Sequence, residues 1–335
     1  MLDFSIIVPV YNVEKYIERC LNSVYSQDFD GNFEVIAIND YSTDKSLEIL
    51  KKYKQKYSDL IIVNNEINLK QAKTRQEGMS RARGKYIMHL DSDDWIVNNS
   101  LQTLKIFIDK YDPDVIAYNY VNKYETGFSS NINGIEKEYF TTNKSTVVNY
   151  FLGNSVTKLV KRNLVENLIS NKVSVNHSED FLYCIELLSL VNNVLLLPYD
   201  FYVYFHNTSS ISNTAKNNKF LKDQIKVLET LNKLNDKFDF EKIGIIKIIR
   251  QHFLKYVHLK ICEIKFLESK EFSYLNIFYK KFSILFKGSI LNIKDSKKIK
   301  FSIRYKWFSL YQVVNRFSLK TGIFILHKHF KNNNK

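Results

Sequence analysis

The sequence predicts an α/β protein in which a wound, mainly parallel sheet is followed by a helical C-terminal region. Strand and helix patterns alternate four times in about the first 120 residues, which is typical of a parallel sheet with crossover helices. The strand candidates are β-branched runs without polar alternation, such as FSIIVPV at residues 4–10, and such runs indicate strands buried on both faces. From about Asn217, apolar residues fall at helical spacing with lysines between them. We therefore divide the chain into residues 1–216 and residues 217–335.

The elements of the first half follow from these patterns in order. Strands are expected at residues 4–10, 33–38, 60–63, 86–90 and 114–121, and helices at residues 13–27, 44–57, 69–83 and 98–111. Ser42 or Thr43 is expected to cap the second helix, because a hydroxyl there can accept a hydrogen bond from its first turn. Gly84 is expected to end the third helix in the left-handed conformation.

The elements of the second half are spaced less regularly. The polar segment at residues 123–146 indicates a long loop or a hairpin over the site. We expect a strand that turns into a helix at residues 155–165, an apolar helix at 181–191, strands at 194–197 and 201–205, and a polar loop at 207–214. Further helices are expected at residues 221–234, 243–267, 272–286 and 303–317, before a last apolar and basic segment at 321–331.

The composition is that of a globular protein with an uneven charge distribution. The 335 residues are 45% hydrophobic and 25% charged, and the net charge is +14. Residues 294–335 contain eleven Lys or Arg and one acid, so this segment alone carries +10. It is either a solvated face or a surface for an anionic partner. Trp307 and Phe308 beside Arg304 and Lys306 favour an anionic membrane surface.

We expect neither a targeting segment nor a membrane span. The apolar run at the N-terminus is short and has no basic region before it, so we interpret it as a strand and not a signal peptide. The sequence has no run of eighteen apolar residues, and its three cysteines are far apart without a CxxC pair. These features predict a cytoplasmic protein, peripherally associated with the cytoplasmic face of the membrane through its basic C-terminal region.

Three carboxylates crowd the end of the fourth predicted strand. Asp91, Asp93 and Asp94 directly follow the apolar run at residues 86–90, which places them where ligands bind in open α/β sheets. Hard oxygen donors that converge there suit Mg2+ or Mn2+. An acidic loop that caps the next helix would have the same sequence. Asn12 and Asp40 also follow predicted strands, so parallel strands would bring all these side chains to one edge.

The ordered motifs SIIVPVYN, EVIAINDYSTD and GKYIMHLDSDDW resemble those of glycosyltransferase family 2, whose inverting enzymes have the nucleotide-sugar-binding fold called GT-A. The similarity covers residues 4–121 and continues more weakly, through KLVKR and SEDFLY, to about residue 212. It implies metal-dependent transfer of a hexosyl or N-acetylhexosaminyl group from a nucleotide diphosphate donor, typically a UDP-sugar. The implied acceptor is a hydroxyl of a glycan or lipid-linked glycan, in the synthesis of bacterial capsule, lipopolysaccharide, lipooligosaccharide or another surface polysaccharide.

The resemblance also implies roles for individual residues. Asp93 is the expected principal ligand of the Mn2+ or Mg2+ cofactor, with Asp91 and Asp94 in the same turn. Asp180 is the expected catalytic base, with Glu179 beside it. The positions implied in nucleotide binding are Pro9, Val10, Tyr11, Asn12, Asp40, Arg75, Asp91 and Ser92.

These residue types suit sugar transfer. A metal that bridges the donor diphosphate acts as a Lewis acid on the departing oxygen, and the phosphates and water supply most of its ligands. A carboxylate that takes the proton of the attacking hydroxyl contributes about 10²–10⁴ in rate. We expect Glu179 and Phe181 to raise the pKa of Asp180 towards the working pH. One direct displacement inverts the anomeric centre, so no covalent nucleophile is required.

Some of these residues also have simpler interpretations. Asp40 is a common cap for the helix that follows it, and Glu179–Asp180 is a favourable pair in the first turn of a helix. Arg75 either faces the diphosphate or lies on a solvated helix face. His177 and His206 are expected to make local polar contacts and not to bind metal.

The chain departs from the family pattern at a few positions. Tyr41 and Lys70 stand where Gly is usual, and Asn39 and Gln76 replace Asp and Asn. Phe205 stands where an Arg often precedes the Ser-Ile-Ser loop. This last departure leaves open how the loop would hold the diphosphate.

Other function classes fit the sequence less well. A sugar-nucleotide pyrophosphorylase would need a Gly-rich phosphate loop after the first strand, where this chain has residues 9–12, PVYN. A basic nucleic-acid-binding protein would use its many aromatic residues for stacking, but the charge lies in the tail and the expected crevice is acidic. The alternative is therefore a basic nucleic-acid- or membrane-binding protein with an inactive transferase fold. Asp91, Asp93 and Asp180 argue for an active enzyme, and we expect no nucleic-acid partner.

Overall fold

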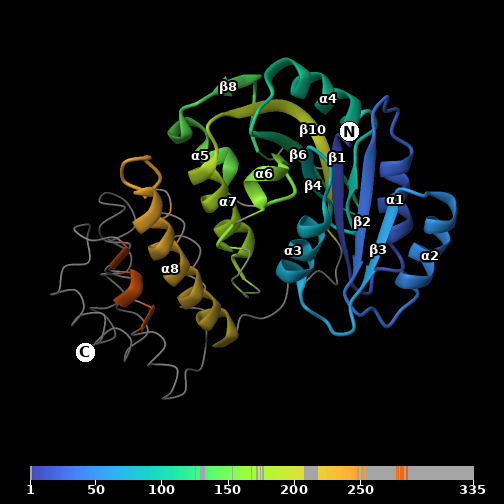
Figure 1. The fold of residues 1–335 in the computed structure, drawn as a ribbon, viewed down its shortest axis with the longest axis horizontal. Coiled ribbons are helices and arrows are strands. Elements are labelled where there is room, and N and C mark those ends of the chain that lie inside the picture. Colours follow the sequence, from blue (N-terminus) through green and yellow to red (C-terminus); the bar gives the residue numbers. More distant parts are fainter. Residues whose placement is uncertain are drawn as a thin grey trace, which may run out of the picture. The chain divides into compact units, whose positions relative to one another are not determined.

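A central sheet organises residues 1–214, the first of two units in the computed structural model of this chain (Figure 1). In the part that the structure describes, its strands follow the order β3-β2-β1-β4-β9-β6-β10-β5, with β7 paired to β6 and β8 paired to β10. Strands β3, β2, β1, β4, β6 and β10 share one direction, and β9 lies antiparallel between β4 and β6. This mainly parallel sheet confirms the predicted α/β fold class.

The strands and helices have the following bounds. The strands are β1 (Phe4–Val10), β2 (Phe33–Asn39), β3 (Leu60–Asn64), β4 (Tyr86–His89), β5 (Trp95–Ile96), β6 (Val115–Tyr124), β7 (Gly127–Phe128), β8 (Tyr139–Thr141), β9 (Lys158–Lys161) and β10 (Val194–Phe205). The helices are α1 (Ile17–Tyr25), α2 (Ser46–Lys56), α3 (Gln71–Arg81), α4 (Ser100–Tyr111), α5 (Lys144–Phe151), α6 (Arg162–Val165), α7 (Glu179–Leu190) and α8 (Asn218–Phe238).

The description covers most of the first unit and less of the second. The described residues are 2–124, 126–128, 133–152, 154–166, 168–170, 173, 175, 177–206, 218–246, 249, 253, 277–278, 280–282 and 284–285. The predicted loop at 207–214, the helix at 303–317 and the segment at 321–331 lie outside these residues, as does most of the helices predicted at 243–267 and 272–286.

Helices cover both faces of the parallel strands (Figure 1). Phe4, Ile6 and Val8 of β1 belong to one buried cluster with the apolar faces of α1, α2 and α4. α3 packs on the opposite face, where Gly78 permits close approach, because a Cβ at that position would lie 2.4 Å from Ile7 Cγ2. Burial on both faces explains why β1 is a continuous apolar run.

Two local predictions on helix ends are wrong. Neither Ser42 nor Thr43 caps α2; instead Asp44 Oδ1 accepts a hydrogen bond from Ser46 N at 3.0 Å. Gly84 does not end α3 in the left-handed conformation, since α3 ends at Arg81 and Gly84 is not among the described residues with positive φ. Gly is required there by close packing: a Cβ would lie 2.5 Å from the backbone carbonyl carbon of Phe4.

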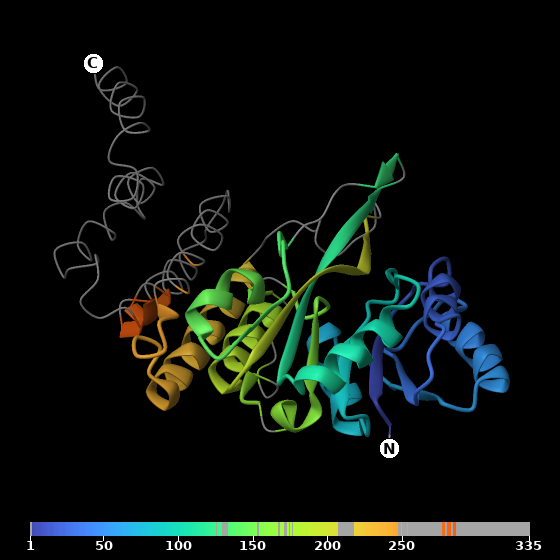
Figure 2. The same ribbon diagram turned by 90° about the horizontal axis from the view of Figure 1, so that it is seen from above.

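The second half of the sheet follows the prediction more closely. β6 and β7 form a short hairpin, with Lys123 opposite Phe128, at the start of the segment where a long loop or a hairpin was expected, and β9 leads directly into α6. The two strands predicted at 194–197 and 201–205 are one strand, β10, which runs beside β6 (Figure 2). Register shifts around Asp200 mark the point where the predicted strands were separated.

The described part of the second unit, residues 215–335, consists mainly of α8. One stripe of this helix is buried through Leu221, Leu228 and Leu231, as its apolar spacing predicts. No helix in the described residues combines the length and apolar character that a membrane span requires.

Candidate active site

The carboxyl ends of β1 and β2 meet at one edge of the sheet. Val10 at the end of β1 pairs with Asn39 at the end of β2. The loops that follow are joined, because Asn12 N donates to Ser42 Oγ at 3.1 Å and Asn12 Oδ1 accepts from Thr43 N at 2.8 Å. The parallel order therefore brings the segments after these two strands together, as the sequence pattern indicated.

The loop residues at this edge are exposed and strained. Pro9 and Val10 belong to β1, whereas Tyr11 and Tyr41 are 43% and 54% exposed. Asn12 and Tyr41 have φ values of 52° and 65°, a region that bulky side chains rarely adopt. Tyr41 stands where the family pattern has Gly, so the strain is a consequence of that departure. Strain of this kind is concentrated at functional sites.

Asp40 does not cap the helix that follows it. The residue is 3% exposed, and its carboxylate accepts hydrogen bonds from Asn65 Nδ2 (3.0 Å), Leu69 N (2.7 Å) and Lys70 N (2.9 Å). Lys70 has a φ of 73° and occupies another position where Gly is usual. Asp40 therefore fixes the loop before α3, and its contact with a nucleotide base stays a prediction.

Arg75 connects two of the predicted site carboxylates. Its Nη2 lies 2.7 Å from Asp91 Oδ1 and its Nη1 lies 2.7 Å from Asp180 Oδ1, with only 6% of its side chain exposed. Gln71 Nε2 also donates to Asp91 Oδ1 at 3.3 Å. Burial alone would lower the pKa of Arg75, but the charges of Asp91 and Asp180 outweigh it and raise that pKa, so the guanidinium stays charged. Arg75 is thus not a residue of a solvated helix face.

Glu179 is an acid of the candidate site with a raised pKa. Burial, followed by the charge of neighbouring Asp180, raises the pKa of Glu179 to about 7. Both acids lie in the first turn of α7, where the helix dipole favours negative charge, and Ser178 precedes them with a φ of 67°. The sequence predicted a raised pKa for Asp180, whereas the raised pKa lies on Glu179 beside it.

Asp94 has a structural environment. It is completely buried; its Oδ2 accepts a hydrogen bond from Tyr202 OH at 2.5 Å and its Oδ1 accepts one from Phe205 N at 2.7 Å. Burial, with the charges of the other two acids in the turn, raises the pKa of Asp94 well above its usual range. We therefore leave Asp94 out of the proposed metal site. Ser92, 6% exposed, is also largely buried.

A guanidinium from α1 supports the acidic turn. Arg19 NH2 donates to the main-chain oxygen of Asp93 at 2.7 Å. Its guanidinium carbon lies 4.1 Å from the centroid of the Trp95 ring and 4.4 Å from that of Phe205. Phe205, which replaces an expected Arg, thus contacts an Arg supplied by a different element.

The remaining carboxylates suit a metal that the donor helps to bind. Among the described residues, no three His, Cys, Asp or Glu side chains converge as a complete protein metal site. Asp91 and Asp93 are both partly exposed. Such a pair fits Mg2+ or Mn2+ with phosphate oxygens and water as its other ligands, since these ions are usually held by one or two carboxylates and substrate phosphates.

Arg19 and Tyr202 contribute to the site although the sequence did not predict them there. Each meets the acidic turn across a large sequence separation, 74 residues for Arg19 to Asp93 and 108 for Tyr202 to Asp94. The sequence carries no local signal for such contacts. His206 makes the predicted local polar contact, with Nε2 2.9 Å from Asn122 Oδ1.

Known proteins are similar to parts of this chain. Residues 5–168 match the model of the family described as glycosyl transferase family 2. The poly(ribitol-phosphate) beta-N-acetylglucosaminyltransferase TarS of Staphylococcus aureus is 41% identical over 118 residues, which are 35% of this chain and 20% of that protein. An uncharacterized glycosyltransferase of Haemophilus influenzae is 29% identical over 262 residues, 76% of this chain and 94% of that protein. The match to TarS thus spans about a fifth of the length of that relative.

A solved structure shares the fold. Residues 1–349 of S. aureus TarS, crystallised in complex with UDP-GlcNAc, give a TM-score of 0.70 at 22% identity, and the match covers 93% of this chain and 90% of that one. At this identity the likeness concerns the fold alone, and it confirms the GT-A arrangement.

Proposed function

Residues 5–168 belong to glycosyl transferase family 2, and on this premise we propose that the chain is an inverting, metal-dependent transferase that moves a sugar from a UDP-sugar to a hydroxyl of a glycan or lipid-linked glycan. The complex of TarS with UDP-GlcNAc supports a UDP-sugar donor. The name of TarS, which specifies poly(ribitol phosphate), supports an acceptor among bacterial surface polymers. UDP-GlcNAc is therefore the first donor to test.

One observation carries this proposal: a single buried guanidinium holds the predicted donor-side acid and the predicted base. Arg75 lies 2.7 Å from both Asp91 and Asp180. Transfer requires the base and the donor to keep a fixed relative position, because a small displacement removes much of the rate gained from orientation. The ion pairs supply such a constraint between α3, the acidic turn and α7.

In the proposed mechanism, Asp93 and Asp91 would hold Mg2+ or Mn2+ together with the donor phosphates, and the ion would stabilise the charge on the departing diphosphate. Asp180 accepts the proton of the acceptor hydroxyl while that oxygen forms its bond to the anomeric carbon. The bond from this carbon to UDP breaks, and its electron pair stays on the phosphate oxygen. One displacement inverts the anomeric centre.

Thermal stabilisation by donors tests this function. A ligand that binds the folded protein raises its Tm by mass action. UDP-GlcNAc and other nucleotide sugars should be compared with and without Mn2+ on the wild type, Asp93→Ala and Asp109→Ala. Asp109 is the matched control, because it is an exposed acid on α4 whose ion-pair partner in the described residues is Lys105. A Mn2+-dependent shift lost only in Asp93→Ala supports the proposal, and the absence of a shift with every donor contradicts it.

We further propose that the basic segment at residues 294–335 binds anionic lipid at the cytoplasmic face of the membrane. Its charge of +10 and its Trp and Phe residues support this. The full chain should co-sediment with phosphatidylglycerol vesicles and a chain that ends at residue 291 should not; equal co-sedimentation would contradict the proposal.

A further inference from the structure

A pocket beside Asp180 contains polar groups that the proposed reaction does not use. It encloses about 490 Å3, including space open to solvent. Its lining comes from α3, from His89 at the end of β4, from the first turns of α7, and from residues between Ser155 and Val175. The pocket therefore lies where the proposed base meets the interior of the first unit.

Several buried polar atoms of this lining have no hydrogen-bond partner among the described residues. They are His89 Nδ1, Ser155 Oγ, Ser170 Oγ, Tyr183 OH and Arg75 Nε. The described part of the chain has eleven such atoms in all, so nearly half of them surround one pocket. Buried polar groups are normally paired, and an unpaired one costs stability. Such a concentration indicates that a ligand supplies the missing partners.

The segment that carries Ser170 is held firmly. Glu186 on α7 is 1% exposed, and its carboxylate accepts hydrogen bonds from Ile169 N at 2.7 Å and Ser170 N at 2.6 Å. His89 and Tyr183 contact each other edge to face, with ring centroids 5.8 Å apart. The pocket wall is thus fixed by buried contacts of its own.

The chemistry of the lining selects the class of ligand. Hydroxyls both donate and accept hydrogen bonds, so Ser155, Ser170 and Tyr183 match a ligand with several hydroxyls of its own. The charged groups of the lining are two acids, Glu179 and Asp180, and two cations, Lys73 and Arg75, and Arg75 is already paired with Asp180. The lining therefore favours neither an anion nor a cation. Apolar side chains complete the wall, and they suit the C–H faces of a sugar or polyol. These are Ala72, Met79, Val173, Val175 and Leu182.

We propose that this pocket binds a neutral, hydroxyl-rich unit of the acceptor, with its reacting hydroxyl at Asp180 and its other hydroxyls paired with Tyr183, Ser155 and His89. The assignment rests on the proposed function, since it takes Asp180 as the base. The donor sugar is also rich in hydroxyls, so the test must separate these two sources.

Ligand-observed NMR on the full chain, with free ribitol and free N-acetylglucosamine as probes, tests the pocket. At least one probe should bind the wild type, and Tyr183→Phe, which removes a single oxygen, should raise its Kd about three- to tenfold. The Tm of Tyr183→Phe should be unchanged or higher, because the lost hydroxyl has no partner in the described protein. Ser155→Ala provides a second variant with the same expectation.

Tyr25→Phe is the matched control. Tyr25 OH is another buried hydroxyl without a hydrogen-bond partner in the described residues, but its ring stacks on Tyr57 at 3.7 Å and does not line the pocket. This variant should bind the probes as the wild type does. Absence of probe binding to the wild type, or equal Kd values in wild type and Tyr183→Phe, would overturn the inference, as would equal weakening by Tyr25→Phe.

Adding nucleotide separates acceptor from donor. A probe that stays bound in saturating UDP-GlcNAc supports an acceptor site. Displacement by UDP-GlcNAc but not by UDP would assign the pocket to the donor sugar and overturn the proposal. Failure of the proposed function is detected separately, as absence of UDP-GlcNAc binding, because the effect of Tyr183→Phe on the probes is measured without nucleotide.

Discussion

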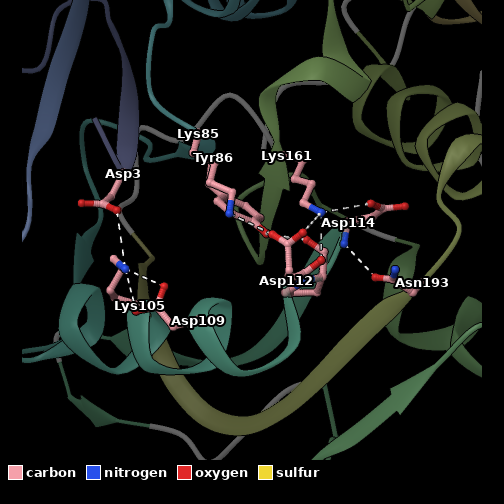
Figure 3. A network of polar contacts seen from close by, with 10 residues as sticks. Asp3, Lys85, Tyr86, Lys105, Asp109, Asp112, Asp114, Lys161 and Asn193 are labelled. Atoms are coloured by element: carbon pink, nitrogen blue, oxygen red, sulfur yellow. Dashed lines mark hydrogen bonds and ion pairs between the residues drawn. The ribbon is translucent and has the colours of Figure 1, made fainter. Parts of the chain in front are cut away.

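Two networks of charged side chains lie at opposite edges of the same sheet and differ mainly in burial. At the amino edge, Asp112 pairs with Lys85 and Lys161, each at 2.9 Å, and 61% of its side chain is exposed (Figure 3). At the carboxyl edge, Arg75 pairs with two carboxylates of the candidate site, and 6% of its side chain is exposed. One network has two cations for an exposed acid, and the other has one buried cation between two acids.

The amino-edge network ties the strands together. Tyr86 OH donates to the main-chain oxygen of Pro113 at 2.6 Å, and Asp114 N donates to Asn193 Oδ1 at 2.8 Å (Figure 3). Asp114 Oδ2 accepts from Asn192 N at 2.7 Å. These bonds join the starts of β4, β6 and β10, so this network serves the fold.

The same residue types therefore have opposite properties at the two edges. Hydrogen bonds from Lys85 and Lys161 lower the pKa of Asp112 to about 2, whereas burial and a neighbouring acid raise the pKa of Glu179 to about 7. A pKa that is perturbed by burial in a cleft marks a candidate for a functional site, and ion pairs in structural networks perturb pKa values as well. The following variants test whether the carboxyl-edge network is needed for activity and the amino-edge network only for stability.

The largest expected effect is the loss of activity in Asp180→Asn. Removing the proposed base should lower kcat about 10²–10⁴-fold, measured as UDP release from the proposed donor UDP-GlcNAc in the presence of acceptor. Asp112→Asn should keep wild-type kcat and lose less than about 1 kcal/mol of stability, because its ion pairs are exposed. A comparable loss of kcat in both variants would remove the functional distinction between the edges.

Arg75→Met should cause the largest loss of stability. The substitution leaves Asp91 and Asp180 without their cation in a largely buried site, which should lower the free energy of unfolding by about 3 kcal/mol. Lys85→Met, which breaks an exposed pair, should cost less than about 1 kcal/mol. Urea unfolding midpoints at constant m-value measure both. Adding Asp180→Asn to Arg75→Met should recover part of the loss, and no recovery would show that Arg75 acts through packing alone.

The two edges should also respond to pH with opposite sign. Folded Glu179 keeps its proton up to about pH 7, while the unfolded chain releases it near 4.5, so Glu179 makes the protein less stable as pH rises through this interval. Glu179→Gln should therefore gain on the order of 2 kcal/mol relative to the wild type by pH 8.

Asp112 has a folded pKa of about 2 against 3.8 unfolded, so its contribution is present above pH 4 and lost as pH falls towards 2. The Tm of the wild type, Glu179→Gln and Asp112→Asn from pH 2 to pH 8 measures both effects. Curves for the two variants that depart from the wild type in the same pH interval would contradict the assignment.

The fold class could be predicted from the sequence because strands and helices produce short, local patterns of apolar residues. Continuous apolar runs identified the parallel strands, and their alternation with helical spacing gave their order along the chain. Helix ends were predicted less well. Asp44, and neither of the two hydroxyl residues expected there, accepts the hydrogen bond at the start of α2. Gly84 was identified as necessary, but for the wrong reason, because contact with the backbone of Phe4 cannot be inferred from neighbouring residues.

The residues of the candidate site could be predicted from the sequence, but the contacts between them could not. The acidic turn and the Glu179–Asp180 pair are visible as motifs, but the ion pair between Arg75 and Asp180 spans 105 residues. Asp94 is buried, whereas Asp91 and Asp93 beside it are partly exposed, and the sequence carries no local signal of this because the contact of Asp94 is with Tyr202 in β10. Pattern analysis therefore finds the charged residues, while tertiary packing decides which of them are structural.

The smallest expected effect concerns backbone strain at the carboxyl edge. A φ of 65° costs a side chain such as that of Tyr41 about 1 kcal/mol, and Gly adopts it freely. Tyr41→Gly should gain about 0.5 kcal/mol, because the greater entropy of unfolded Gly offsets part of the relief. Asn99→Gly, at a φ of 61° outside the candidate site, is the control and should show a similar or smaller gain.

Only Tyr41→Gly should weaken UDP-GlcNAc binding in calorimetry, because it removes a 54% exposed ring from the loop that is hydrogen-bonded to Asn12. Unchanged affinity would mean that the strain at Tyr41 has no role in donor binding, and burial alone would then distinguish the two edges.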